Sequence, residues 1–170
     1  EAFNIDGLGK KVIDQFWDLK MIKYPEDIFK LDYDKISDLD GWGKLSIQNL
    51  RKAVDNSKTI SLNRFIYSIG IRHIGQENAK ILSGFFISIN KFTDLFINYK
   101  RKEILNNFKD LDGMGETQIN SIEVFFTNLK NVEVVKSLIK ILEIKKYQSL
   151  NKKGKFSNKN LMFTGGFEKI

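Results

Sequence analysis

Four short glycine-containing stretches are the parts of this sequence whose residue types and spacing could bind a charged ligand. They read IDGLG at 5–9, LDGWG at 39–43, IRHIG at 71–75 and LDGMG at 111–115. Glycine permits positive φ and lacks a β-carbon, so another backbone or a ligand can approach closely. A glycine turn that leads into a helix also leaves N–H groups unpaired at the positive end of the helix dipole. These turns predict anion sites, and the anion that recurs at regular spacing is a nucleic-acid phosphate.

Basic side chains add positive charge to three of these hairpins. Lys10 and Lys11 follow the first hairpin, and Lys44 follows the second. Arg72 lies within the third hairpin, and Lys80 lies one helical turn beyond it. Because nucleic-acid phosphates attract lysine and arginine, we predict that these basic residues contact DNA.

The remaining charged and polar residues of the hairpins limit this interpretation. Glu116 follows the fourth hairpin and would repel a phosphate, so we expect the weakest electrostatic contact there. His73 replaces the first glycine of the third hairpin, and no carboxylate or nucleophile motif accompanies it. We interpret His73 as a turn residue that tolerates the local geometry rather than as a catalytic base. A sharp turn between packed helices is the alternative for any one hairpin, but four copies in a basic chain favour binding.

The sequence contains no catalytic or metal-binding motif that we can identify. GLGKK and GMGET lack the G-x-x-x-x-G-K-[ST] spacing of a phosphate loop. Lys109 stands one residue too far from Asp112 and Gly113 to form the K-x-D-G motif of enzymes that attach AMP to a lysine. The absence of cysteine excludes a disulfide framework and a thiolate metal site within these residues. We therefore predict no catalytic residue and no metal ligand in this chain.

The hairpins recur together with helical patterns. Their last glycines, at 9, 43, 75 and 115, are separated by 34, 32 and 40 residues, which indicates a repeated supersecondary unit. Apolar residues follow each glycine at spacings of three and four, which place them on one face of a helix. The four predicted faces are Ile13, Phe16 and Leu19; Ile47, Leu50 and Val54; Ala79, Leu82, Phe85 and Phe86; and Ile119, Ile122, Phe125 and Phe126.

Each unit is therefore predicted to be a helix, a hairpin and a helix, in a mainly α fold with four tandem units. Patterns at 34–39 and 62–69 predict helices before later hairpins. The 34-residue helical repeat of protein-binding solenoids has a similar period, but it lacks this glycine turn. The apolar residue inside each hairpin is expected to pack between the flanking helices, and these residues are Leu8, Trp42, Ile74 and Met114.

The composition is that of a basic globular domain. The chain has 170 residues, 42% of them hydrophobic, and a net charge of +7 with a pI near 9.4, which favours an anionic partner. Codon bias in an AT-rich genome would also produce many lysines, so the charge alone does not decide between the two explanations. No apolar run is long enough to span a membrane, and we expect no membrane partner. Because the chain begins with Glu1 rather than Met, we expect it to be a piece of a longer protein.

The C-terminal end differs from the helical repeats. Residues 147–159 lose the apolar period and contain four lysines, so we predict a basic linker there. The segment 160–170 begins NLMFTGGF, which predicts a short β-strand and a glycine turn from a truncated next domain. A disordered end is the alternative.

Several stretches together resemble the C-terminal half of bacterial NAD-dependent DNA ligases. They are AFNIDGLG, DGWGKLSIQNLRKAVDNSK, FIYSIGIRHIGQENAKIL and DLDGMGETQINSIEVFF. Ser46, Asn49, the Ser57–Lys58 pair and the Gly70–Gly75 stretch fall where that family has them. The resemblance covers 1–146 as a tandem helix-hairpin-helix domain, and 160–170 looks like the start of a BRCT domain.

The resemblance implies a DNA-gripping fragment of a nick-sealing enzyme of DNA replication and repair. In that family, NAD donates AMP to a lysine in an N-terminal domain absent here, and a zinc module precedes the equivalent of Glu1. It thus implies no cofactor within this fragment, and NAD, Mg and Zn in the parent enzyme. Nicked duplex DNA and the parent's other domains are the implied partners of a monomer in the bacterial cytoplasm, at the nucleoid. The glycines implied to engage the DNA backbone are Gly7, Gly9, Gly41, Gly43, Gly75, Gly113 and Gly115.

Two other classes of function stay open on the sequence. One is the DNA-binding module of an excision-repair or junction-processing protein. The other is a protein-interaction domain, in which the hairpins are structural and the basicity reflects codon bias. Substitution of hairpin glycines distinguishes them, because a binding role predicts lost DNA affinity with the fold intact.

Overall fold

The computed structural model describes residues 3–148, and this part of the chain is mainly helical, as the sequence predicted. The predicted tail strand at 160–170 and most of the predicted linker lie outside the described residues. The elements, with η for a 3-10 helix, are α1 (Lys10–Asp18), η1 (Pro25–Lys30), α2 (Tyr33–Ser37), α3 (Lys44–Ser57), β1 (Thr59–Ser61), α4 (Leu62–Ser68), α5 (Gln76–Phe86), α6 (Ile89–Phe92), η2 (Thr93–Phe96), α7 (Asn98–Asn107), η3 (Phe108–Asp110), α8 (Glu116–Thr127), α9 (Leu129–Ile141) and β2 (Glu143–Lys145).

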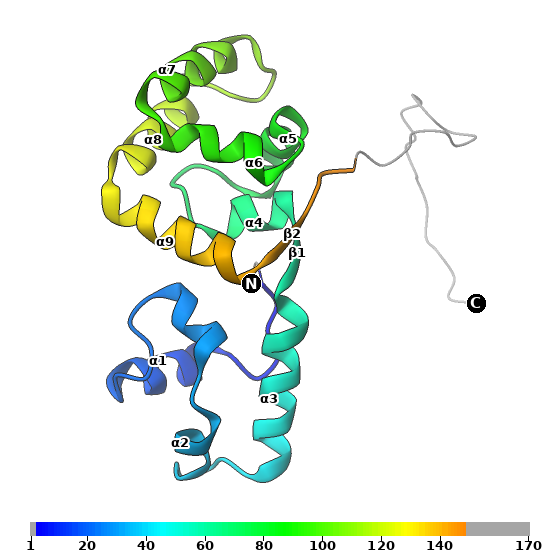
Figure 1. Ribbon diagram of the computed structural model, residues 1–170, viewed down its shortest axis with the longest axis vertical. Coiled ribbons are helices and arrows are strands. Elements are labelled where there is room, and N and C mark those ends of the chain that lie inside the picture. Colours follow the sequence, from blue (N-terminus) through cyan, green and yellow to red (C-terminus); the bar gives the residue numbers. More distant parts are fainter. Residues whose placement is uncertain (1–2, 149–170) are drawn as a thin grey trace, which may run out of the picture.

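These elements form two lobes, which Figure 1 shows one above the other. The N-terminal lobe (residues 3–57) contains α1 to α3, and the C-terminal lobe (residues 58–148) contains α4 to α9. The long helix α3 leads through β1 into α4, and η1 of the N-terminal lobe packs against α9. Each lobe contains two of the glycine hairpins, which we number hairpin 1 (5–9), hairpin 2 (39–43), hairpin 3 (71–75) and hairpin 4 (111–115).

Every hairpin leads directly into a helix, as predicted. The helices α1, α3, α5 and α8 begin at the residue after the last glycine of hairpins 1 to 4. Helices α2, α4 and α7 precede hairpins 2, 3 and 4, so the helix-hairpin-helix unit is present in each of these three cases. The apolar residues seven positions after each glycine lie in the core with at most 1% of their surface exposed, and they are Phe16, Leu50, Leu82 and Ile122.

The prediction that Leu19 belongs to the buried face was wrong. Helix α1 ends at Asp18, and Lys20 takes a positive φ of 56°. The chain then reverses, and the Met21 N–H donates to the carbonyl of Phe16 at 2.9 Å. This reversal leaves Leu19 49% exposed and places Ile22 in the core instead.

The core of the C-terminal lobe is a cluster of phenylalanine rings. The rings of Phe86 and Phe108 lie 5.9 Å apart, and those of Phe92 and Phe126 lie 5.6 Å apart, both edge-to-face. The buried Arg101 donates from Nη1 to the carbonyls of Leu95 at 3.0 Å and Phe126 at 3.2 Å. The cluster and this arginine join η2, α7 and α8, and so hold hairpins 3 and 4 in a fixed relation.

The structure contains a short parallel sheet that the sequence analysis missed. Strand β1 pairs with β2 over three residues, with Thr59 opposite Glu143 and Ser61 opposite Lys145. The Thr59 hydroxyl also donates to Glu143 Oε2 at 2.9 Å. Strands this short are too brief to show an alternating pattern in the sequence. The sheet closes the C-terminal lobe, because it returns the chain after α9 to the start of α4.

Candidate nucleic-acid interface

The four hairpins share one backbone geometry. In each, the fourth residue donates its N–H to the carbonyl of the first at 3.0–3.2 Å, and the third residue has positive φ, which is a type II turn. The last residue of each hairpin is a glycine with extended backbone, with φ between −93° and −79°, and it is the N-cap of the following helix. The residues at the positive-φ position are Gly7 at 81°, Gly41 at 85°, His73 at 61° and Gly113 at 84°.

His73 occupies the turn position that glycine has in the other three hairpins. Its φ of 61° lies in the left-handed region, where histidine is enriched among non-glycine residues. The prediction that His73 is a turn residue is therefore confirmed. The side chain is exposed and projects from hairpin 3.

Hairpins 1 and 2 pack against each other's helices. Trp42 of hairpin 2 stacks on Phe16 of α1 with ring centroids 5.5 Å apart, and its Nε1 donates to Gln15 Oε1 at 3.4 Å. In return, Gly7 of hairpin 1 faces the side chain of Leu50 in α3. The two turns therefore line one groove, which includes Gly7 and Gly41.

Hairpin 4 packs more tightly against the helix of hairpin 3. A β-carbon at Gly113 would lie 2.6 Å from Cδ1 of Ile81 in α5, so a side chain there would displace the end of Ile81. Gly113 also has positive φ, which disfavours any other residue. The positive φ and the contact with Ile81 together favour glycine at this position without any role in binding.

The hairpins differ in whether the N–H of their last glycine is available. In hairpin 2 the Gly43 N–H donates to the hydroxyl of Ser46 at 3.0 Å, and in hairpin 4 the Gly115 N–H donates to Gln118 Oε1 at 3.2 Å. Within residues 3–148, the N–H groups of Gly9 and Gly75 make no hydrogen bond. We call hairpins 1 and 3 open and hairpins 2 and 4 self-capped. The side chain at the third position of the following helix determines whether the glycine N–H is capped, and the sequence analysis did not consider that position.

The predicted basic residues are exposed, and one of them is already paired. Lys10, Lys11, Lys44 and Arg72 make no ion pair within the described residues. Lys80, in contrast, lies 2.6 Å from Glu77 Oε1, one turn away on α5. Its charge is therefore partly neutralised, which the sequence analysis did not anticipate.

Acidic residues of the turns also escaped the sequence analysis. Asp6, Asp40 and Asp112 stand at the second position of hairpins 1, 2 and 4, and all three are exposed. Hairpin 3 has Arg72 at the same position. Hairpin 3 therefore combines an open glycine N–H with a cation where the other hairpins have a carboxylate.

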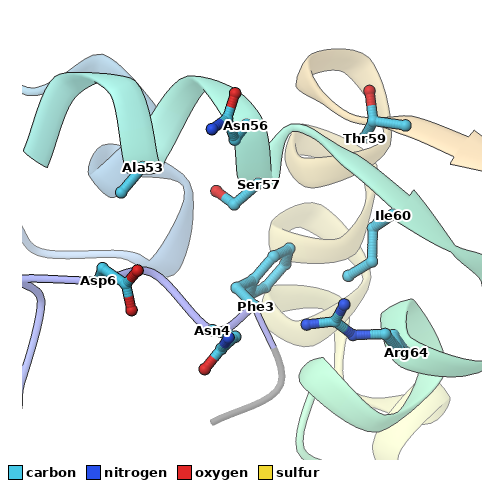
Figure 2. A pocket seen from close by; sticks show the side chains of 9 residues that line it. All are labelled: Phe3, Asn4, Asp6, Ala53, Asn56, Ser57, Thr59, Ile60 and Arg64. Atoms are coloured by element: carbon cyan, nitrogen blue, oxygen red, sulfur yellow. The ribbon is translucent and has the colours of Figure 1, made fainter. Parts of the chain in front are cut away.

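A small polar cavity of about 220 Å³ lies where the two lobes meet. Figure 2 shows its walls: Asn4 and Asp6 come from the segment before α1, Asn56 and Ser57 from the end of α3, and Arg64 from α4. The Arg64 side chain reaches toward the segment that leads into hairpin 1. The position of hairpin 1 thus depends on contacts with the C-terminal lobe as well as with α3.

Two features are absent from the described residues. Residues 3–148 contain no group of three or more His, Cys, Asp or Glu side chains that could hold a metal ion. Over the same range, every helix is too short or too polar to cross a membrane.

The sequence is similar to known proteins over nearly its whole length. Residues 64–135, which include hairpins 3 and 4, match the family model described as a helix-hairpin-helix motif. A protein named DNA ligase from Pelagibacter ubique (strain HTCC1062) is 48% identical over 165 residues, which are 97% of this chain and 24% of that protein. Proteins of the same name from Rickettsia rickettsii (strain Sheila Smith) and Rickettsia bellii (strain RML369-C) are each 37% identical, over 99% and 96% of this chain. The chain spans about a quarter of the length of these curated relatives.

Proposed function

We propose that this chain is the DNA-binding segment of a DNA ligase. It matches a helix-hairpin-helix motif, and nearly its whole length aligns with about a quarter of the length of each of several proteins named DNA ligase. It binds the backbone of duplex DNA without reading the base sequence. Phosphate contacts position a protein on DNA but carry no base information.

The observation that supports this most directly is the turn geometry of the hairpins. Each places a glycine at the N-cap of a helix, and in hairpins 1 and 3 the glycine N–H has no partner within the described residues. Backbone N–H groups at helix N-termini are common donors to DNA phosphates. The exposed Lys10, Lys11 and Arg72 flank these two open hairpins and add the charge that phosphates attract.

The parent protein would seal nicks between a 3′-hydroxyl and a 5′-phosphate, with NAD as the donor of AMP. In this proposal the adenylated lysine, NAD, Mg²⁺ and Zn²⁺ belong to other parts of the parent, and residues 3–148 contain no cluster suited to a metal. Nicked duplex DNA and the parent's other domains are the partners of a monomer in the bacterial cytoplasm, at the nucleoid. Several simultaneous backbone contacts would place the nick at a distant active site at low entropic cost.

Fluorescence anisotropy with a labelled nicked duplex, measured across a salt series, tests the proposal. If only the open hairpins neutralise one or two phosphates each, the log–log slope of affinity against salt will be about −2 to −4, and if all four do so it will be about −4 to −7. The slope should be the same for duplexes of unrelated sequence. A flat slope, or a preference of orders of magnitude for one sequence, would contradict backbone binding.

A further inference from the structure

An open groove of about 710 Å³ lies between hairpin 3 and α8. Gly75, whose N–H is open, is not among the residues that line it. Its floor includes Ile69 and Gly70 at the end of α4, and Asn131 of α9. The residues that give it chemical character are Arg72, His73, Thr117, Asn120 and Ser121.

The lining of this groove contains one cation, Arg72, together with hydrogen-bonding side chains and no carboxylate. Among the described residues, the side chains of Arg72 and Asn120 make no hydrogen bond or ion pair. The Ser121 hydroxyl donates its one proton to the carbonyl of Thr117 at 2.8 Å, so it is not a free donor in this structure. Arginine, asparagine, serine and threonine side chains are common donors to DNA phosphates.

The groove between hairpins 1 and 2 has the opposite character. It is lined by Asp6 and Asp40 and by no lysine or arginine. Both grooves lie beside glycine turns, so their difference in charge is a property of the residues and not of the fold. Charge therefore favours an anionic strand in the groove beside hairpin 3 over the groove between hairpins 1 and 2.

One stripe of α8 forms the wall of the groove. Thr117, Asn120, Ser121 and Val124 follow the i, i+3, i+4, i+7 spacing, and they lie opposite the buried Ile122 of the same helix. Val124 adds an apolar side chain to this stripe and is 72% exposed. Polar donors next to an apolar side chain match a sugar-phosphate backbone, which alternates charged phosphates with apolar sugar carbons.

We propose that this groove is a second DNA-backbone site, in which Arg72 and Asn120 donate to a phosphate and Val124 contacts the adjoining deoxyribose. The inference rests on the proposed function, in which one DNA strand binds the open Gly75 N–H of hairpin 3. The groove would bind the next part of that strand, along the face of α8. Glu116 and Glu123 lie on α8 outside the lining of the groove.

Opposite charge changes at one position test this site in the 170-residue chain. Asn120→Asp keeps the side-chain shape but adds a negative charge, and we expect affinity for a labelled nicked duplex to fall about tenfold at fixed salt. Asn120→Lys should raise affinity about threefold and make the salt slope steeper by about 1. Asn90→Asp is the matched control, because Asn90 is exposed on α6 and lines none of the grooves described above. Circular dichroism checks that each variant is folded.

The outcomes separate this inference from the proposed function. If the unmodified chain binds duplex DNA and both Asn120 variants bind like Asn90→Asp, the groove is overturned as a DNA site and the proposed function stands. If the unmodified chain does not bind duplex DNA at all, both proposals are overturned. Weaker binding by Asn120→Asp together with tighter binding by Asn120→Lys supports the groove, because a purely structural role would not give effects of opposite sign.

Discussion

The open and self-capped hairpins have the same turn but different chemistry at the helix N-terminus. Hairpins 1 and 3 have Val12 and Asn78 at the third helical position, and these side chains leave the glycine N–H unpaired. Hairpins 2 and 4 have Ser46 and Gln118 there, and both accept from the glycine N–H. A repeated motif therefore does not imply a repeated function. The open hairpins are suited to binding, and the self-capped hairpins are suited to holding their partners in place.

The largest expected effect is on DNA binding by the open hairpins. A β-carbon at Gly9 or Gly75 meets nothing within 4 Å, and both residues have negative φ, so alanine fits the folded state. The added methyl groups would obstruct the approach of a phosphate to the N–H. We expect Gly9→Ala/Gly75→Ala to lower duplex affinity about 100-fold, or roughly 2.7 kcal/mol, in an anisotropy titration.

Gly43→Ala is the control for that prediction. Its β-carbon also meets nothing within 4 Å, but its N–H already donates to Ser46. Affinity should change less than about twofold. If Gly43→Ala weakened binding as much as either single substitution in an open hairpin, the distinction between the two kinds of hairpin would be wrong.

The second prediction concerns stability and compares Gly113 of a self-capped hairpin with Gly7 of an open one. Both have positive φ, so alanine costs about 1–2 kcal/mol of unfolding free energy at either position. A β-carbon at Gly113 would also displace Ile81, whereas one at Gly7 would lie 4.0 Å from Leu50. Urea denaturation should show Gly113→Ala to be less stable than Gly7→Ala by about 1 kcal/mol. Equal losses would mean that hairpin 4 has no special packing role.

The third prediction opens a self-capped hairpin. Ser46→Ala removes the acceptor of the Gly43 N–H, which then becomes available at the start of α3. Loss of this contact should cost about 0.5–1 kcal/mol of stability, while affinity for duplex DNA rises about two- to threefold. Weaker DNA binding by a folded Ser46→Ala protein would show instead that the serine hydroxyl itself contacts the backbone.

The smallest expected effect comes from the ion pair on α5. Glu77→Gln releases Lys80 from its 2.6 Å contact, next to the open hairpin 3. Because exposed ion pairs contribute little to stability, the melting temperature should hardly change. Duplex affinity should rise about twofold at low salt and lose this gain at high salt. An affinity increase that persists at high salt would argue against an electrostatic cause.

Local features of this protein were predictable from the sequence. The glycine repeat located all four turns and the first residue of each following helix, because a turn and an amphipathic pattern depend on neighbouring residues. His73 was placed in its turn for the same reason. The buried positions seven residues after each glycine also followed from helical periodicity alone.

Features that join distant residues, or that depend on side-chain geometry, were not predictable. Leu19 was misplaced because the reversal at Lys20 depends on how the chain after α1 returns to the core. Nothing local to β1 or β2 indicates their pairing across more than eighty residues, since each strand has only three. Asn78 and Gln118 are both amides at the third helical position, and only the rotamer of each decides that Gln118 caps its glycine N–H while Asn78 does not.

The sequence by itself thus determined where the turns and helices of this protein lie, because hydrogen bonds and periodicity act over a few residues. Tertiary structure alone decided which turns share a groove and which glycine, Gly113, lies against Ile81. It also decided that Arg72 and the face of α8 line the same groove. The physical reason is that packing and electrostatic fields act through space. Residues with the same local pattern therefore acquire different chemistry from neighbours that the sequence does not place beside them.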